Sequence, residues 1–126
     1  MSEQSSDRIF TVNDFVKENA DRTVVRTYSD EDLVTLVEWI DPGKEFEAPH
    51  WHPEAAHVFV FMSGEGEALL GNGHWEPVRA GQFLVNPRNK VHAMRNTSAT
   101  ERLVWTCVHV THGLPYVVHE VGEDHN

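Results

Sequence analysis

The sequence predicts an all-β domain, either a sandwich or a barrel, with at most one short N-terminal helix. Eight or more short runs rich in β-branched and aromatic residues recur along the 126 residues, and turn-forming glycines and prolines separate them. Only one segment, near the N-terminus, has the character of a helix. A chain of this length has room for one domain, which we expect over residues 9–120, between a flexible N-terminus (1–8) and a polar tail (121–126).

The elements can be assigned in chain order. Residues 9–12 are expected to form a short edge strand, and Asn13 is a suitable N-cap for a helical turn that runs through Glu18. Pro and Gly in the segment 41–43 indicate a turn, and Gly-Asn-Gly at 71–73 is a hairpin sequence. The remaining runs are expected to be strands: 23–28, 33–40, 57–62, 65–70, 74–78, 82–85, 91–96 and 103–110.

Composition excludes several classes of partner. The chain carries 20 acidic and 10 basic residues, a formal charge of −10, which argues against nucleic acid and anionic membranes as partners. It has one cysteine, Cys107, so no internal disulfide can form and a reducing compartment is expected. The N-terminus does not have the pattern of a signal peptide, and no apolar stretch approaches the length of a membrane span. We therefore expect a cytoplasmic protein, with Cys107 as a small buried residue that has no polar partner in its own segment.

Histidines form the strongest functional signal. His50, His52 and His57 lie within eight residues, and His92 follows in a different strand. In an extended strand His50 and His52 project to the same face, and imidazole is a ligand that suits Zn, Cu, Fe and Ni. The sequence thus predicts one divalent transition metal bound by His50, His52 and His92, with His57 as the fourth ligand. The histidines without paired spacing are expected to be surface or structural residues: His74, His109, His112, His119 and His125.

Side-chain alternation predicts a pocket beside these histidines. Residues two or four positions from His57 and His92 share their faces. In the strand 82–85 the sequence leaves two registers open, one with Phe83 and Val85 inward and one with Gln82 and Leu84 inward. An apolar, aromatic cavity is the expected form of a small-molecule site, although an ordinary barrel core would use the same side chains. The predicted substrate-pocket residues are Phe59, Phe61, Met94, Asn96 and Phe83.

The spacing of these residues resembles the two sequence motifs of the cupin superfamily over about residues 33–110. The first motif corresponds to Gly43, His50, His52, position 57 and Gly64. The second corresponds to Gly81, Pro87, His92 and Asn96, with Asn89 in place of a glycine. The resemblance implies a jelly-roll β-barrel that holds a metal near one mouth and a homodimer in solution.

At position 57 the chain departs from most metal cupins, which have a glutamate there. His57 makes the ligand set neutral, so that the charge of a bound dication favours an anionic or enolate-like ligand. A ligand set of four histidines resembles that of small manganese or iron cupins with oxygenase-type activity. It also resembles that of cupin-type aromatic polyketide cyclases, which hold zinc.

The resemblance therefore implies a dioxygenase-type oxidoreductase that acts on a small oxygen-rich substrate and uses Fe or Mn. The alternatives are a non-redox Zn or Ni cyclase, isomerase or lyase, and a cupin that binds a small ligand or a metal without catalysis. Spacing favours no general acid or base, and the candidates are Tyr28, Glu38, Glu54 and Tyr116.

Overall fold

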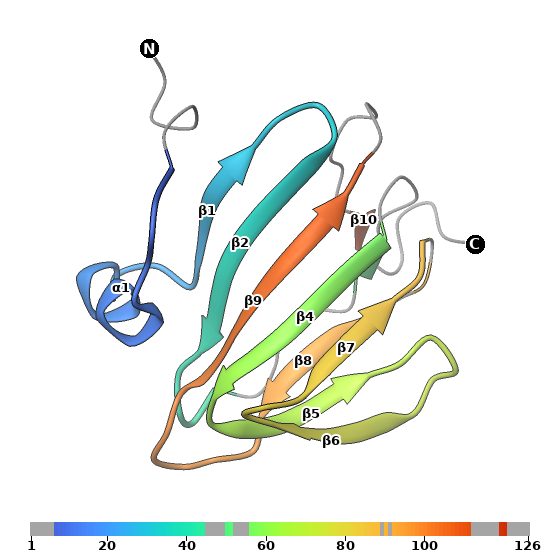
Figure 1. Cartoon of the computed structure of the whole chain (residues 1–126). Helices are drawn as coiled ribbons and strands as arrows, with labels where there is room; N and C mark the ends of the chain where they lie inside the picture. Colours follow the sequence, from blue (N-terminus) through green and yellow to red (C-terminus); the bar gives the residue numbers. More distant parts are fainter. Residues whose placement is uncertain are drawn as a thin grey trace.

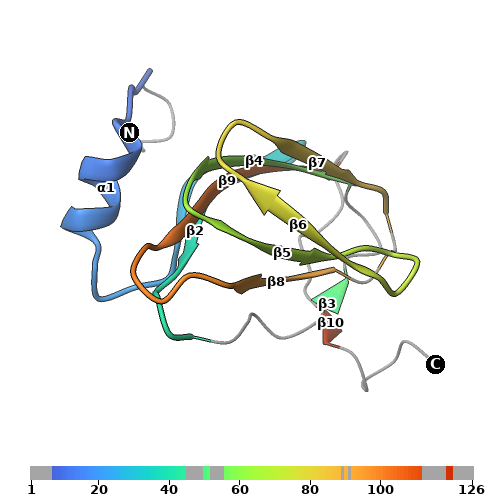
Figure 2. The same cartoon turned by 90° about the horizontal axis from the view of Figure 1, so that it is seen from below.

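Two antiparallel sheets face each other and enclose the core of the domain (Figures 1 and 2). This is a computed structural model that describes residues 7–44, 50–51, 56–88, 90, 92–111 and 119–120, of which 50–51 and 119–120 are described as backbone alone. One sheet has the strand order β1-β2-β9-β4-β7, the facing sheet has the order β6-β5-β8, and β3 pairs with β10. The predicted all-β fold with one short helix is confirmed.

The chain forms its elements in a simple order. They are α1 (Val12–Glu18), β1 (Val24–Ser29), β2 (Leu33–Ile40), β3 (His50–Trp51), β4 (Ala56–Ser63), β5 (Glu65–Leu69), β6 (Trp75–Arg79), β7 (Phe83–Asn86), β8 (Ala93–Asn96), β9 (Leu103–Val110) and β10 (His119–Glu120). Strands β2 and β9 have the predicted bounds, and most of the other predicted strands differ by one or two residues.

The predicted edge strand at 9–12 is wrong. Residues 9–11 form no strand, Ile9 is 99% exposed, and Val12 is already the first residue of α1. Thr11, not Asn13, occupies the N-cap position, and its side chain makes no capping hydrogen bond. The reason is tertiary: Val12 and Val16 pack against Val37 and other residues on the outer face of the large sheet, so burial favours a helix here.

The core lies between the two sheets. Inward residues of β2, β4 and β9 meet inward residues of β5 and β8, as alternation requires. The buried members of this cluster are Val34, Leu36, Ile40, Phe59, Phe61, Ala68, Met94, Leu103, Trp105 and Cys107. A smaller apolar cluster lies between α1 and the outer face of the large sheet, so α1 covers part of that face.

The other part of that outer face stays uncovered in the described structure. Large apolar side chains there are 36–69% exposed, with Phe83 the most exposed of the set. We call these five residues the apolar outer face: Val60, Met62, Phe83, Val85 and Val108. The strand pairing places Val60 opposite Phe83, so the residues form a continuous surface over β9, β4 and β7.

Gly64 makes the tight connection between β4 and β5 possible. Its φ is +80°, a conformation that side chains rarely adopt, and a Cβ atom there would overlap the backbone carbonyl of Arg102. Within the described ranges, no helix is long and apolar enough to span a membrane.

Candidate metal centre

His57 lies on the inward face of β4, directly opposite His109 of β9. The two rings are almost fully buried, with exposed fractions of 1% and 2%, and their centroids are 4.0 Å apart at an angle of 47°. His92, immediately before β8, approaches His57 from the facing sheet with a centroid distance of 4.6 Å. The fold therefore gathers three buried imidazoles, two of which were predicted as metal ligands.

Asn86 of β7 determines the surroundings of His92. Its side-chain amide lies 2.8 Å from His92 Nδ1, and both residues are buried. The amide atom at this distance is the nitrogen Nδ2, which also donates to the carbonyl oxygen of Lys90 at 3.5 Å. A flip of the amide would place its oxygen there instead, so that His92 Nδ1–H donates to it and the lone pair of Nε2 is left for a metal. Asn86 is also the cross-strand partner of His57, so it is placed by the same strand pairing.

The other two predicted ligands are only partly within the described residues. His50 belongs to β3, where it pairs with Glu120 of β10. Strands β3 and β10 lie at the end of the barrel at which β4 and β8 begin, which is the end that carries His57 and His92 (Figures 1 and 2). The side chain of His50, and all of His52, fall outside the described residues.

The described residues fit part of a transition-metal site. His57 and His92 supply two buried imidazoles from facing sheets, and the Asn86 amide can orient one of them. Among the residues whose side chains are described, no three His, Cys, Asp or Glu residues are arranged to hold a metal ion. A complete site therefore needs donors from outside the described side chains, where the predicted ligands His50 and His52 lie.

Three of the predicted pocket residues lie inside the barrel, and one of them contacts the histidines. Phe59 makes edge contacts with His57 and His92, at centroid distances of 5.5 and 5.4 Å. Phe61 and Met94 point inward as well, and all three are at most 2% exposed. All three are members of the core cluster, so they belong to the packed interior, and Phe59 in addition borders the histidines.

Two other expected pocket residues have different positions. Phe83 is 69% exposed on the outer face, because Phe59 pairs with Leu84 and the second of the two registers is the one formed. Asn96 is buried, but its amide donates to the carbonyl oxygens of Ile40 and Glu101, at 2.9 and 2.8 Å. Its Oδ1 accepts a hydrogen bond from the Ser98 backbone. Its polar atoms hold backbone segments together, so they do not face a substrate.

Sequence reasoning missed a line of polar groups inside the barrel, which we call the interior polar chain: Glu38, Cys107 and His109. The Cys107 thiol donates to Glu38 Oε1 at 3.3 Å and lies 3.3 Å from His109 Nε2. Since the thiol proton is used by Glu38, the sulfur is the acceptor for His109 Nε2–H. Cys107 is buried as expected, but the expectation that it has no polar partner in its own segment is wrong, and His109 is an interior residue.

A signal for this chain exists in the sequence. Cys107 and His109 are two residues apart in a strand, so they share a face, and the apolar neighbours of that strand place this face inside. The contact with Glu38 depends on the pairing of β2 with β9, which spacing alone does not reveal.

Burial raises the pKa of the Glu38 carboxyl above its usual value, although hydrogen bonds from Cys107 and Trp105 act in the opposite direction. Of the other acid–base candidates, Tyr28 lies at the exposed end of β1, where its hydroxyl donates to Asp30 at 2.6 Å. That hydrogen bond raises the pKa of Tyr28. Glu54 and Tyr116 lie outside the described residues.

Comparison with known proteins places these features in a wider context. A family model described as "Cupin domain" matches residues 36–109, more than half of the chain. An uncharacterised protein of Aquifex aeolicus (strain VF5) is 36% identical over 55 residues, which are 44% of this chain and 45% of that protein. The match thus spans less than half the length of that relative.

Several solved structures share the fold. An uncharacterised conserved protein with a double-stranded β-helix domain from Klebsiella pneumoniae superposes with a TM-score of 0.75 at 25% identity, over 91% of this chain and 99% of that one. The polyketide cyclase RemF from Streptomyces resistomycificus gives 0.62 at 19% identity, over 76% of this chain and 65% of that one. An oxalate oxidase gives 0.61 at 22% identity, over 74% of this chain and 50% of that one.

Proposed function

The chain belongs to the cupin family, and from that premise we propose that it is a metal-dependent enzyme. Its substrate is a small oxygen-rich organic molecule, and its chemistry is that of a dioxygenase-type oxidoreductase. One observation carries the proposal: two imidazoles, His57 and His92, are buried with their ring centroids 4.6 Å apart at the barrel end that also carries β3.

In this proposal His57 and His92 bind a divalent metal together with His50 and His52. Fe or Mn, when bound, supplies the redox chemistry at the coordination positions that the histidines leave open. Because four imidazoles are neutral, the site favours a substrate that binds through an anionic oxygen, such as an enolate or a carboxylate.

The neighbouring residues orient the ligands and exclude water. With its amide turned so that the oxygen faces His92 Nδ1, Asn86 accepts from Nδ1–H and fixes the plane of that ring. Phe59 lies edge-on to both histidine rings and keeps bulk water from their inner side. His109, held by Cys107, lies against the ring of His57 and restricts its rotation.

A second candidate function is a non-redox cyclase, isomerase or lyase that uses Zn or Ni as a Lewis acid. A specific observation favours it: His109 is a buried imidazole beside His57, and its Nε2 lies 3.3 Å from the Cys107 sulfur. Such a group could take part in proton transfer, which cyclisation and isomerisation require. The names of the two structural relatives, an oxalate oxidase and a polyketide cyclase, agree with either chemistry on this fold.

Metal reconstitution separates these candidates. The protein is freed of metal with a chelator, reloaded with Fe(II), Mn(II), Zn(II) or Ni(II), and assayed for oxygen uptake with small dicarboxylates, diols and β-diketones. We expect Fe(II) or Mn(II) to restore substrate-dependent oxygen uptake. Turnover with Zn(II) or Ni(II) and no oxygen uptake would replace the oxidative proposal with the non-redox one, and metal binding without turnover would replace both with a binding role.

The ligand assignment has a matched control within the chain. His92→Ala should abolish stoichiometric metal binding, whereas His74→Ala, at an exposed histidine in a turn, should leave it unchanged. Full metal occupancy in the His92→Ala protein would show that the site lies elsewhere.

We also propose that the protein is a homodimer that buries the apolar outer face, and that it acts in the cytoplasm on a small molecule. The five residues of this face belong to three adjacent strands, none of them is charged, and the chain as a whole carries a charge of −10. A second copy can therefore approach at this face with the least electrostatic repulsion. Apolar surfaces of this kind on a monomer mark interaction sites.

A further inference from the structure

Glu38 is a carboxyl group on the inward face of a strand whose neighbouring inward residues, Leu36 and Ile40, are apolar. It lies opposite Trp105 of β9, about 13 Å along that strand from His109 if each residue contributes about 3.3 Å. Removing a carboxyl group from water is costly unless it gains partners. Its position is therefore unexplained by packing alone, and the proposed metal chemistry does not use it directly.

Both hydrogen bonds to Glu38 use the same oxygen. Oε1 accepts from the Cys107 thiol at 3.3 Å and from Trp105 Nε1 at 3.4 Å. The described side chains make no hydrogen bond to the second oxygen, Oε2, and Glu38 borders a cavity of about 370 Å³. The carboxyl group is thus held on one side and has an acceptor atom available on the other.

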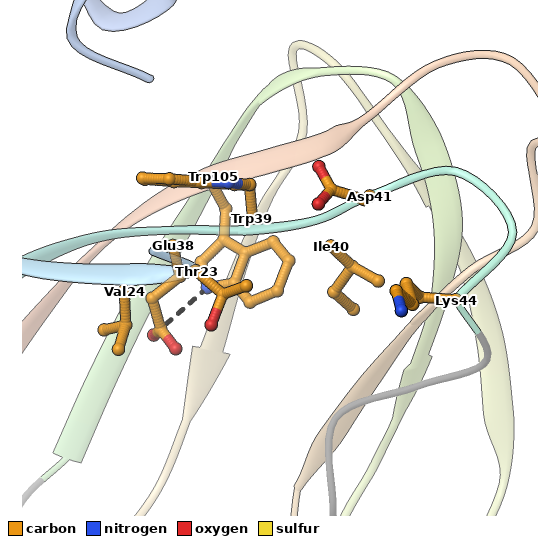
Figure 3. A pocket seen from close by; sticks show the side chains of 8 residues that line it. All are labelled: Thr23, Val24, Glu38, Trp39, Ile40, Asp41, Lys44 and Trp105. Atoms are coloured by element: carbon orange, nitrogen blue, oxygen red, sulfur yellow. Dashed lines mark hydrogen bonds between the residues drawn. The ribbon is translucent and has the colours of Figure 1, made fainter. Parts of the chain in front are cut away.

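The cavity wall is largely apolar and aromatic. Figure 3 shows the Glu38 carboxyl joined to the Trp105 indole, with Thr23 and Val24 on one side and Ile40 and Lys44 on the other. The carboxylate of Asp41, also in the wall, is engaged by Arg102 at 2.8 Å. Glu38 is therefore the acidic group of this cavity that remains available to a ligand.

We propose that this cavity, which we call the Glu38 pocket, binds a small organic ammonium ion with a compact apolar body. The N–H groups of the ligand donate to Glu38 Oε2, and the apolar body contacts Val24, Ile40 and the face of Trp105. An ammonium beside an indole also gains cation–π attraction. A cavity of this size is at the lower end of the range for small-molecule sites, which suits a ligand of a few carbon atoms.

This proposal is independent of the metal centre. The Glu38 pocket is lined by the start of β1, the end of β2 and the turn after it, whereas the histidines lie where β4 and β8 begin. The interior polar chain connects the two regions through Cys107 and His109. Occupation of the pocket can be measured on the protein whether or not a metal is bound.

Nuclear magnetic resonance gives a direct test, with the indole N–H signal of Trp105 as the reporter. The full-length protein is titrated with n-butylammonium and, as matched probes, with n-butanol and butyrate. We expect a saturable shift of the Trp105 indole signal, and of the amide signals of Thr23 and Val24, with n-butylammonium alone. Equal binding of butanol or butyrate, or no saturable shift, would overturn the proposal.

Two variants test the chemistry and the location separately. Glu38→Gln keeps the shape and the oxygen that accepts from Cys107 and Trp105, but it removes the charge and replaces the second acceptor oxygen with an NH2 donor. It should weaken n-butylammonium binding by about tenfold or more. Val24→Trp, at a residue that is 46% exposed, should block the cavity without altering the carboxyl group. Glu31→Gln, at an exposed carboxylate outside the pocket, should bind as the unmodified protein does. Unchanged affinity in either of the first two variants, with native thermal unfolding, would refute the site.

Discussion

Asn86 should control the metal affinity of the proposed site without being a ligand itself. Its amide is 2.8 Å from His92 Nδ1, and both side chains are at most 4% exposed. Asn86→Ala removes a partner that orients the ring, and loss of such a partner lowers metal affinity by about 10- to 100-fold. This range corresponds to about 1.4–2.8 kcal/mol, which agrees with the roughly 1–3 kcal/mol cost of leaving a buried polar group unsatisfied.

Competition against a chromophoric chelator measures this change directly. Asn86→Asp retains an oxygen acceptor, so its affinity should remain close to that of the unmodified protein. Asn72→Ala, at an exposed asparagine in the β5–β6 turn, is the control for loss of an amide. If Asn86→Ala binds metal within about twofold of the unmodified protein while His92→Ala loses it, the proposed orienting role is refuted.

Three further predictions concern stability and assembly. Burial raises the pKa of Glu38, so the folded state keeps the carboxyl proton to a higher pH than the unfolded state does. The folded protein should therefore lose stability as the pH rises above the ordinary carboxyl range. Urea unfolding of the unmodified protein and of Glu38→Gln between about pH 4 and 8 should show the variant gaining relative stability with pH, and a constant difference would contradict this. Gly64→Ala should destabilise the fold by about 3 kcal/mol, because Gly64 has a positive φ and an added Cβ would overlap Arg102. Gly73→Ala is the control, since Gly73 has a φ of +86° but open space around it, and this change should cost about 1 kcal/mol. Equal losses of unfolding free energy in calorimetry would exclude the overlap. Phe83→Glu should cost about 1 kcal/mol or less of monomer stability yet dissociate the dimer in sedimentation analysis, and an unchanged dimer would place the interface elsewhere.

The fold could be predicted because its signals are local. Strands β2 and β9 were assigned with their full bounds from runs of β-branched and aromatic residues that end at turn-forming sequences. The sequence Gly-Asn-Gly at 71–73 predicts a hairpin, and in the structure Gly73 has the positive φ that such a turn uses. The residues at 9–12 were misassigned because their conformation depends on a contact with Val37, which is distant in sequence.

The candidate site was predictable only where periodicity was sufficient. Alternation correctly predicted Phe59 beside the histidines and Met94 inside the barrel, but it could not choose between the two registers of β7, and Phe83 was assigned to the wrong face. His109 was missed because its partner across the sheet, His57, is 52 positions away in sequence, as their numbers show. Contacts of this kind require the strand order, which spacing within one strand does not contain.

The burial of Cys107 makes it a natural reporter of barrel opening. The thiol is 1% exposed and lies on β9, which has a neighbouring strand on each side, and its proton is engaged by Glu38. An alkylating reagent can reach the sulfur only after these strands separate or the two sheets part. The labelling rate of this single cysteine would therefore measure the free energy of that opening, in the way that hydrogen exchange does for a backbone amide. Any ligand that stabilises the closed barrel should slow labelling in proportion to its occupancy.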